Sequence, residues 1–256
     1  MINGSEYDEK TTMERYNLLT EIFHGIIPVK LFGSCRFKCT PMDQVISLTG
    51  IDAAMIYLAE EPNFIHELLD RYIETEISRI KQYEKLGIIS SNNSFKAVGS
   101  NCPGYTSELP PSPESGIGAK IGDIWGENAD QIMTAVSPAM TKEFCFDHEK
   151  VWAEQFKLHS YGCCERLDNK LDLLKAAFPN LRKVSSSPYS DLEKAAEQLG
   201  NKYVISFKPN STYLAAEKPE MGLLRQELIH GCRLAEKYNL NLVFNMKTMI
   251  SLNNEP

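Results

Sequence analysis

The chain has 256 residues, of which 43% are hydrophobic and 24% charged, and its formal net charge is −7. This is the composition of an ordinary globular protein, and the length suits one large α/β domain. The acidic balance argues against a nucleic acid or an anionic membrane as the main partner, because both carry negative charge.

The sequence also lacks the usual signs of export or membrane insertion. No apolar run approaches the roughly 20 residues that a membrane helix needs. The polar stretch 1–15 does not have the apolar core of a signal peptide. The seven cysteines are an odd number, and their thiols are expected to be reduced. We therefore expect a cytoplasmic protein.

Short β-type runs alternate with helical patterns along the chain, which is typical of parallel βα units. Each run is rich in Val, Ile, Phe or Leu, as expected for strands that are buried on both faces. The predicted strands are Ile27–Phe32, Gly87–Ser91, Lys157–Gly162, Arg182–Ser187, Tyr203–Lys208 and Leu242–Lys247.

The helical patterns between these runs are clearer. Apolar residues from Phe64 to Tyr83 keep a three-to-four spacing and form one stripe. Ser190 with Glu193 predicts a capping box at the start of a later helix. The predicted helices cover Thr11–Ile26, Phe64–Tyr83, a segment that Ser137–Pro138 opens, a segment that ends at Gly200, and Glu220–Tyr238.

Residues 91–122 are irregular and rich in Pro, Gly, Ser and Asn. A loop of this length is either a lid or binding loop or a passive excursion, and the sequence leaves both open. The six strands are two fewer than a closed barrel needs. We predict a single α/β domain over 1–256, a TIM-type (β/α)8 barrel that is incomplete at the N-terminus, with the missing strands before Met1.

Eight segments occur in an order that resembles the uroporphyrinogen decarboxylase-like superfamily, which includes uroporphyrinogen decarboxylases and cobamide-dependent methyltransferases. The segments are IPVKLFG, GID with EPNFIHELLDRY, GYTSELP, DIWGENADQ, VSPAMTKEF, YGCCERLDNK, PNLRKVSSSPYSDLEKAAEQLG and YVISFKPN. The resemblance covers nearly all of Ile27–Lys247. It implies a barrel with its chemistry at the carboxyl ends of the strands.

The sequence departs from the family pattern in two respects. The Arg-rich N-terminal motif of the decarboxylases is absent, which counts against porphyrinogen decarboxylation. The zinc-dependent methyltransferases carry a His-x-Cys pair on one strand and a distant cysteine near the last strand. In this chain His159 is followed by Ser160 and Tyr161, and Lys247 stands near the position of the distant cysteine.

Cys163, Cys164 and Glu165 directly follow a predicted strand, where barrel active sites lie, and we predict them to be catalytic. A thiolate there could bind zinc, and zinc keeps a bound thiol deprotonated, which makes it a good methyl acceptor. The predicted metal ligands are Cys163, Cys164 and His159. The alternative is two ordinary reduced cysteines and a histidine in the barrel wall.

Further residues are predicted to bind substrate. Lysines at strand ends can hold a carboxylate, a phosphate or a carboxylated corrinoid side chain. A lysine within a barrel strand, as predicted for Lys30, needs a carboxylate partner or an open cavity. Tyr105 and Trp125 could wall a pocket for a flat ligand, or act as local packing anchors. The full predicted set is Lys30, Asn93, Tyr105, Trp125, Lys208 and Lys247.

Three functions stay open at this point. The first is a methyltransferase that handles a corrinoid or a methylated small molecule, with zinc and with a corrinoid presented by a partner protein. The second is a uroporphyrinogen decarboxylase-type lyase acting on a tetrapyrrole, although no arginine cluster stands at the predicted strand ends. The third is a truncated, non-catalytic relative that binds a ligand or pairs as a homodimer over its open strand edges. A fold alone does not decide among them.

Overall fold

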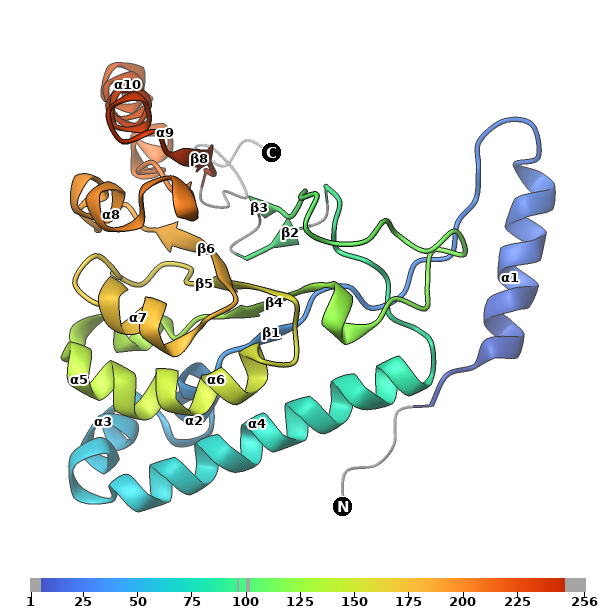
Figure 1. The fold of residues 1–256 in the computed structure, drawn as a ribbon, viewed down its shortest axis with the longest axis horizontal. Coiled ribbons are helices and arrows are strands. Elements are labelled where there is room, and N and C mark those ends of the chain that lie inside the picture. Colours follow the sequence, from blue (N-terminus) through green and yellow to red (C-terminus); the bar gives the residue numbers. More distant parts are fainter. Residues whose placement is uncertain (1–5, 96, 100–101, 247–256) are drawn as a thin grey trace.

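The computed structural model describes residues 6–95, 97–99 and 102–246. It is an α/β fold built on a parallel sheet of six strands in the order β1-β4-β5-β6-β7-β8, so that strands adjacent along the chain lie side by side (Figure 1). The strands are β1 Lys38–Cys39, β4 Trp125–Asn128, β5 Leu158–Tyr161, β6 Leu181–Ser186, β7 Val204–Phe207 and β8 Asn241–Phe244. Among the described residues β8 pairs only with β7, so the sheet is open at this edge.

The last four strands confirm the sequence prediction to within a few residues, but the first two do not. Residues 27–32 belong to no ladder, and the chain joins the sheet later, at β1. The predicted strand Gly87–Ser91 contributes one isolated bridge, between Ile89 and Ser34. The prediction also missed β4, because its sequence WGEN is mostly polar and contains a glycine.

Helices fill the connections between the strands. They are α1 Glu9–Ile22, α2 Pro41–Thr49, α3 Ile51–Glu60, α4 Pro62–Lys85, α5 Pro138–Thr141, α6 Asp147–Ala153, α7 Leu171–Ala177, α8 Leu192–Leu199, α9 Thr212–Ala215 and α10 Met221–Tyr238. Shorter turns are the 3₁₀ segments η1 Ile121–Asp123, η2 Gln131–Ala135 and η4 Gly200–Lys202 and the π-helical segment η3 Lys142–Phe146. Among the described residues, no helix has both the length and the apolar character needed to cross a membrane.

The N-cap residues of two helices can be compared with those predicted from the sequence. Ser137 caps α5 as expected, since its Oγ accepts a hydrogen bond from Met140 N at 3.2 Å. The predicted capping box at Ser190 is wrong, because the cap of α8 is Asp191, whose Oδ1 accepts from Lys194 N at 3.0 Å. Ser190 instead hydrogen-bonds to Ser187 through its hydroxyl.

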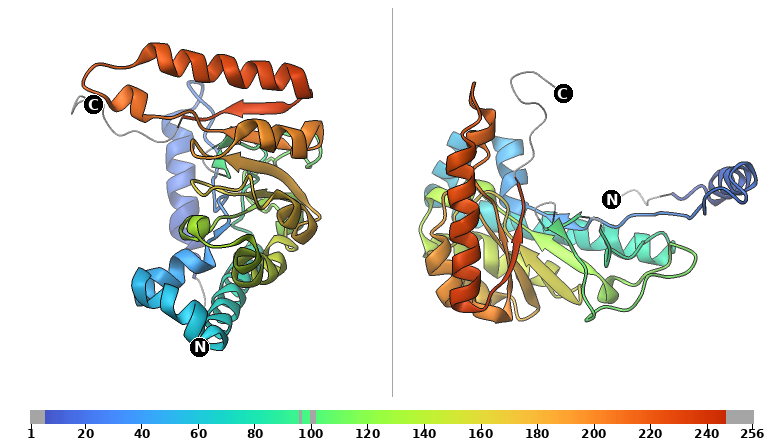
Figure 2. Two further views of the ribbon diagram at one scale, coloured as in Figure 1. Left: turned by 90° about the vertical axis from the view of Figure 1, so that its left-hand side faces the viewer. Right: turned by 90° about the horizontal axis from the view of Figure 1, so that it is seen from above.

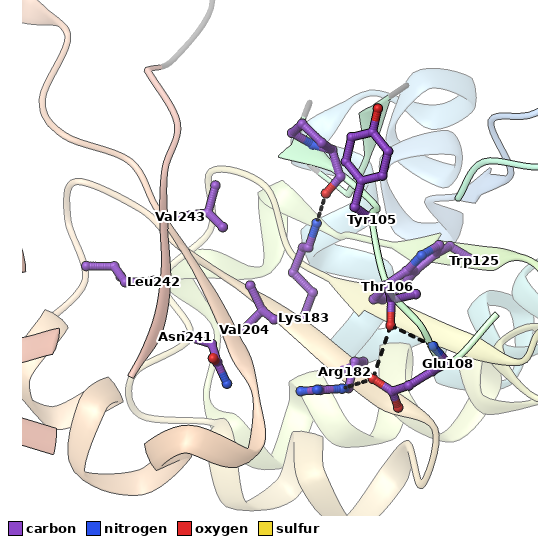
Figure 3. Close-up of a pocket in the computed structure, with 11 residues that line it drawn as sticks. Tyr105, Thr106, Glu108, Trp125, Arg182, Lys183, Val204, Asn241, Leu242 and Val243 are labelled. Atoms are coloured by element: carbon purple, nitrogen blue, oxygen red, sulfur yellow. Dashed lines mark hydrogen bonds and ion pairs between the residues drawn. The ribbon is translucent and has the colours of Figure 1, made fainter. Parts of the chain in front are cut away.

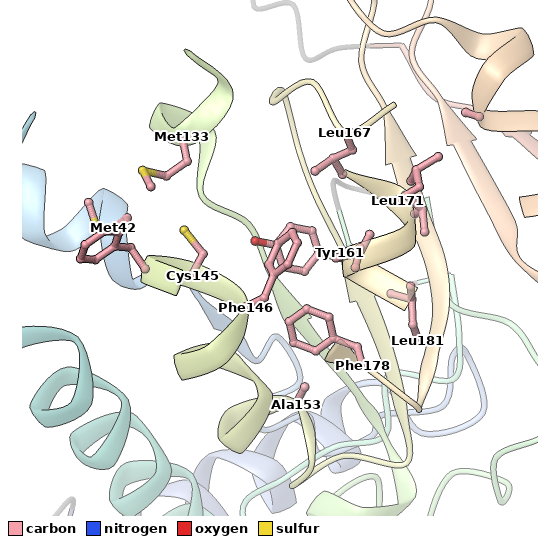
Figure 4. Close-up of a cluster of buried hydrophobic side chains, with 14 of the residues drawn as sticks. Met42, Met133, Cys145, Phe146, Ala153, Tyr161, Leu167, Leu171, Phe178 and Leu181 are labelled. Atoms are coloured by element: carbon pink, nitrogen blue, oxygen red, sulfur yellow. The ribbon is translucent and has the colours of Figure 1, made fainter. Parts of the chain in front are cut away.

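The main hydrophobic core lies between the sheet and the helices on one of its faces (Figures 2 and 4). Three aromatic rings stand at its centre, with Phe146 edge-on to Tyr161 at 5.3 Å and to Phe178 at 5.7 Å between ring centroids. Edge-to-face pairs of this kind add to the gain from burial. The strands therefore sit firmly against α6 and α7, which fixes the ends from which functional side chains project.

The opposite face of the sheet is polar and is covered by the segment that was predicted to be irregular. A two-stranded ladder, β2 Ala97–Val98 and β3 Cys102–Pro103, lies across it. Cys102 Sγ is 2.8 Å from Ser206 Oγ, and Lys183 Nζ donates to Pro103 O at 2.6 Å. Part of the 91–122 segment is therefore packed on the sheet, and it closes off buried polar side chains.

We expect a Gly126→Ala substitution to destabilise the fold by about 1–3 kcal/mol, because overpacking a core forces its neighbours to move. An added Cβ would lie 2.6 Å from Phe156 Cγ. The matched control is Gly222→Ala in α10, where an added Cβ meets nothing within 4 Å. This control should keep or slightly raise stability, by up to about 1 kcal/mol. Urea unfolding of both variants measures the difference, and equal stabilities would contradict the packing described for β4.

Candidate functional site

The carboxyl ends of β5 and β7 carry the candidate site. After β5 the chain turns sharply at Gly162, whose φ of 99° is unfavourable for any other residue. A Cβ at this position would also lie 2.7 Å from Leu167 Cδ1. Glycine therefore allows the tight turn that places the next three residues, Cys163, Cys164 and Glu165, at the end of the sheet.

The two cysteines lie side by side. Their Sγ atoms are 3.5 Å apart, and both side chains are half-buried. Adjacent residues of an extended strand point in opposite directions. The bend over residues 163–165 removes this obstacle and brings both sulfur atoms to one side. All seven cysteines of the chain lie within the described residues, and none forms a disulfide bond.

The carboxyl group of Glu165 holds this bend in place through two hydrogen bonds. Its side chain is buried, with Oε2 accepting from Cys163 N at 2.7 Å and Oε1 accepting from Asp130 N at 3.3 Å. Burial raises the pKa of Glu165, while the backbone N–H donors and the positive charge of Lys208 oppose that rise. The carboxyl group thus joins the loop after β5 to the end of β4, and burial favours its protonated form.

Lys208 follows β7 and is 3% exposed. Its ammonium donates to the carbonyl oxygen of Cys163, which also accepts from Ser185 Oγ at 3.0 Å. A buried cation is costly unless it is hydrogen-bonded. The carbonyl of Cys163 therefore keeps the lysine beside the thiol pair, so that Cys163, Cys164, Glu165 and Lys208 form one cluster.

A pair of buried carboxyl groups stands behind this cluster, and the sequence analysis did not identify it. Asp130 Oδ1 accepts from Met42 N at 2.9 Å, and Glu149 Oε2 accepts from Tyr161 Oη at 2.9 Å. The other oxygens, Asp130 Oδ2 and Glu149 Oε1, are buried without a hydrogen-bond partner among the described residues. Two neighbouring buried carboxylates do not ionise together, so one proton is expected to be shared between them.

Burial is the main cause that raises the pKa of both carboxyl groups, to about 8 for Asp130. The negative charge of Asp130 raises the pKa of Glu149 further, whereas the interaction with Glu149 lowers the pKa of Asp130. Asp43 and Glu165 raise the pKa of Asp130 further because they add negative charge. Asp130 lies within the segment DIWGENADQ and two residues after β4, but that strand was not predicted.

His159 does not join the cysteines. It lies on the helix-facing side of β5, where its Nε2 is 2.8 Å from Asn128 Oδ1 and its ring stacks on Phe178 at 4.8 Å. Complete burial lowers its pKa to about 3, so the ring is neutral. Within the part of the chain that the structure describes, no group of three His, Cys, Asp or Glu side chains is arranged to hold a metal ion.

The remaining predicted residues are scattered. Lys30 is exposed and lies outside the strands, so the expected lysine within a barrel strand is absent. Asn93 pins its own loop, with Oδ1 accepting from Thr106 N at 2.9 Å and Nδ2 donating to Thr106 O at 3.0 Å. Tyr105 and Trp125 line one cavity at the amino ends of the strands, away from the cysteines. Lys247 lies outside the described residues.

Fold and site together define an α/β protein with a cluster of two thiols, a buried carboxyl group and a lysine at the carboxyl ends of parallel strands. No family model matches the sequence, and searches of curated proteins and of solved structures give no significant match. Any function therefore has to be argued from the chemistry of the site.

The carboxyl pair predicts how stability depends on pH. A folded-state pKa above the ordinary range of a carboxyl group means that the folded protein keeps a proton that the unfolded chain loses. The stabilisation is complete below about pH 4 and is lost as the pH rises to about 8. The loss is at most about 1.4 kcal/mol per pH unit for one proton. Asp130→Asn should flatten this slope.

Urea unfolding at intervals from pH 5 to pH 8 measures the slope for the wild type and for Asp130→Asn. Asp172→Asn in α7 is the control, because the Asp172 side chain is 83% exposed. This control should keep the wild-type slope. If Asp130→Asn and the wild type lose stability equally over this range, the shared proton is excluded.

Proposed function

We propose that this protein transfers a methyl group at the Cys163–Cys164 pair, as a relative of the uroporphyrinogen decarboxylase-like superfamily. The single observation that carries the proposal is the cluster itself. Two thiols 3.5 Å apart stand beside a buried lysine and a buried carboxyl group, at the end of the sheet where barrel enzymes place their chemistry. Reduced thiols suit the cytoplasm as the compartment of this reaction.

The strand order supports a (β/α)8-type barrel as the parent architecture. All six strands are parallel, each lies beside its neighbour in sequence, and the helices cover one face. A doubly wound sheet instead reverses its strand order and carries helices on both faces. The open edge at β8 is where a barrel of this kind would need further strands to close.

The residues present supply three parts of a methyl transfer. A sulfur of the pair acts as nucleophile, and its new bond to the methyl carbon forms as the bond between carbon and donor breaks, with the donor keeping the electron pair. The thiol first loses its proton to water, and the positive charge of Lys208 beside the pair stabilises the resulting thiolate. Burial raises the pKa of Glu165, which suits this carboxyl group to give a proton to an oxygen or nitrogen donor atom as it leaves. A corrinoid presented by a partner protein would supply the methyl group.

Zinc fits the described residues only in part. Two thiolates on one zinc ion, each at about 2.3 Å, bring their sulfur atoms roughly as close together as the 3.5 Å between Cys163 and Cys164. Structural and catalytic zinc sites need at least three protein ligands, and His159 faces the helices instead. The described residues thus form half of a zinc site, and the proposed reaction needs only the thiols.

The decarboxylase function has less support from the same cluster. A decarboxylase of this superfamily grips carboxylates with arginines, and Arg166 follows Glu165 directly. Its guanidinium, however, binds Asp168 in two places, with Nε at 2.8 Å from Oδ1 and Nη2 at 3.0 Å from Oδ2. With Arg166 engaged, Lys208 is the cation of the cluster that would have to bind a substrate carboxylate.

We expect methylcobalamin, incubated anaerobically with the reduced protein, to methylate the thiol pair. Intact-mass and peptide mass spectrometry locate the methyl group, and absorbance follows the loss of methylcobalamin. The double variant Cys163→Ser/Cys164→Ser should lower the rate at least 100-fold, since oxygen is a much weaker nucleophile than thiolate sulfur here. Cys232→Ser is the control, because Cys232 is exposed on α10.

Methylation of Cys232 in place of the pair, or a rate no higher than without protein, would rule out the proposal. Elemental analysis after incubation with zinc adds a second readout. Zinc bound by the wild type and lost in the double variant would extend the proposal to a metal-bound thiolate. A folded wild type without zinc would leave the metal-free thiol reaction.

A second candidate function, pairing with another copy of the chain, is favoured by one feature. The N-terminal arm, defined as residues 9–32, stands away from the sheet (Figure 1) and exposes large apolar side chains, with Leu18 56%, Ile22 56% and Ile26 73% exposed. No residue of α1 is buried. Several large apolar side chains exposed in one segment are typical of an interaction site.

A second copy suits the arm because a twofold contact sets the same apolar residues of the two chains against each other. Packing arm against arm would also bury the exposed apolar side chains on both copies at once. We therefore propose a homodimer formed through the arms.

Light scattering after size exclusion tests the dimer. The wild type should elute with the mass of two 28.9-kDa chains, and Ile26→Glu should shift it to one chain by placing a charge in the interface. Leu48→Glu on α2 is the control, because Leu48 is 79% exposed and lies outside the arm. A single-chain mass for the wild type would end the proposal.

A further inference from the structure

A cavity of about 330 Å³ opens on the polar face of the sheet, at the amino ends of the strands (Figure 3). It lies at the opposite end of the sheet from Cys163. Strands β6, β7 and β8 contribute Lys183, Val204 and Val243, and the segment after β3 contributes Tyr105. Its volume falls at the small end of the range for ligand sites.

Lys183 gives this cavity a buried positive charge. The residue is 3% exposed, and its Nζ donates one hydrogen bond, to Pro103 O at 2.6 Å. An ammonium group has three donors, and Pro103 O is its single hydrogen-bond acceptor among the described residues. Burial lowers the pKa of Lys183, and the negative charge of Glu127 opposes this. A buried cation with one neutral acceptor is costly, so an anionic group in the cavity would be favoured.

Two aromatic side chains wall the cavity. Trp125 is buried, and its indole is fixed by a hydrogen bond from Nε1 to Gly104 O at 2.9 Å. Lys183 Nζ lies 5.4 Å from the centre of the indole ring. Tyr105 stands at the rim with 67% of its surface exposed, and in Figure 3 its ring and Trp125 lie on the same side of Lys183. Val204 and Val243 line the other side.

Arg182, the second cation of the cavity, is already engaged. Its Nε donates to Glu108 Oε1 at 2.7 Å, and its Nη1 donates to Lys202 O at 2.7 Å. Glu108 is in turn held by Thr106, whose Oγ1 accepts from Glu108 N at 3.1 Å. The rim is therefore fixed by its own ion pair, which leaves Lys183 as the group that can bind an anion.

We propose that this cavity binds a small aromatic carboxylate, with the carboxylate on Lys183 and the ring between Trp125 and Tyr105. A carboxylate would accept hydrogen bonds from Lys183 directly, which Glu127 does not, and a flat ring suits the two aromatic walls and the valine side chains. The site goes beyond the proposed methyl transfer, because none of its residues belongs to the thiol cluster. The hairpin of β2 and β3 lies between the two ends of this face of the sheet.

Isothermal titration with phenylacetate tests the proposal, with phenylacetamide as the neutral analogue of the same shape. Phenylacetate should bind at least 10-fold more tightly than the amide. Lys183→Met should remove at least 10-fold of the phenylacetate affinity. Lys208→Met replaces the buried lysine at the other end of the sheet and should leave the affinity unchanged. Circular dichroism checks that each variant is folded.

Tyr105→Ala keeps the test decisive if Lys183→Met does not fold. Tyr105 is 67% exposed, so its removal leaves the core intact, and the affinity should fall about 3- to 10-fold with the loss of one aromatic wall. Tyr189→Ala is the matched control, since Tyr189 is 70% exposed and follows β6 at the carboxyl end of the sheet. Cys163→Ser should bind phenylacetate normally, which separates this site from the proposed methyl transfer.

Three results would overturn the proposal. One is no phenylacetate binding at millimolar concentration by the folded wild type. Another is equal affinity for phenylacetate and phenylacetamide, which would mean that no cation binds the carboxylate. The third is a loss of affinity in Tyr189→Ala equal to that in Tyr105→Ala.

Discussion

The two hydrogen bonds that the buried Glu165 carboxyl group accepts, from Cys163 N and Asp130 N, join the ends of β5 and β4. Parallel strands leave their carboxyl ends at one edge, but they do not decide how the following loops are shaped. Here a single side chain does so, because its two oxygens satisfy backbone donors on both loops. The thiol pair, the lysine on the Cys163 carbonyl and the carboxyl pair behind them all depend on that loop geometry.

The two faces of the sheet differ in what they bury, since one holds the apolar core and the other holds polar groups. The helix-covered face holds the aromatic core around Phe146, Tyr161 and Phe178, and His159 is kept neutral there. The other face carries Lys183, Ser206 and other buried polar groups beneath the β2–β3 hairpin. Burying polar groups costs free energy unless each finds a hydrogen-bond partner. A ligand that supplies such partners is therefore expected to bind on this face.

Residue patterns predicted the parts of the fold that are repetitive. β5 to β8 were found because short runs that contain Val, Ile, Leu or Phe alternate with helical patterns. Cys163, Cys164 and Glu165 were found because they follow one of these runs. β4 was missed because glycine and polar residues are not typical of a buried strand. The close contact between Gly126 and the Phe156 ring, which requires glycine, is visible only in the structure. Residues 27–32 have strand composition but no partner strand among the described residues, and composition alone cannot reveal that. The carboxyl pair joins α6 to the end of β4, a contact that no local pattern encodes.

The π-helical turn at Lys142–Phe146 has a consequence for the carboxyl pair. Its i→i+5 hydrogen bonds take one residue more than an α-helical turn, whereas each residue of an α-helix turns by about 100°. The side chains of α6, which follows the turn, are therefore rotated about the helix axis relative to an uninterrupted α-helix. With this rotation Glu149 and Trp152 both face inward with 0% exposure. The position of a shared proton is thus set by the winding of a neighbouring helix. Deleting one residue from that turn would move Glu149 out of reach of Asp130 without altering either side chain.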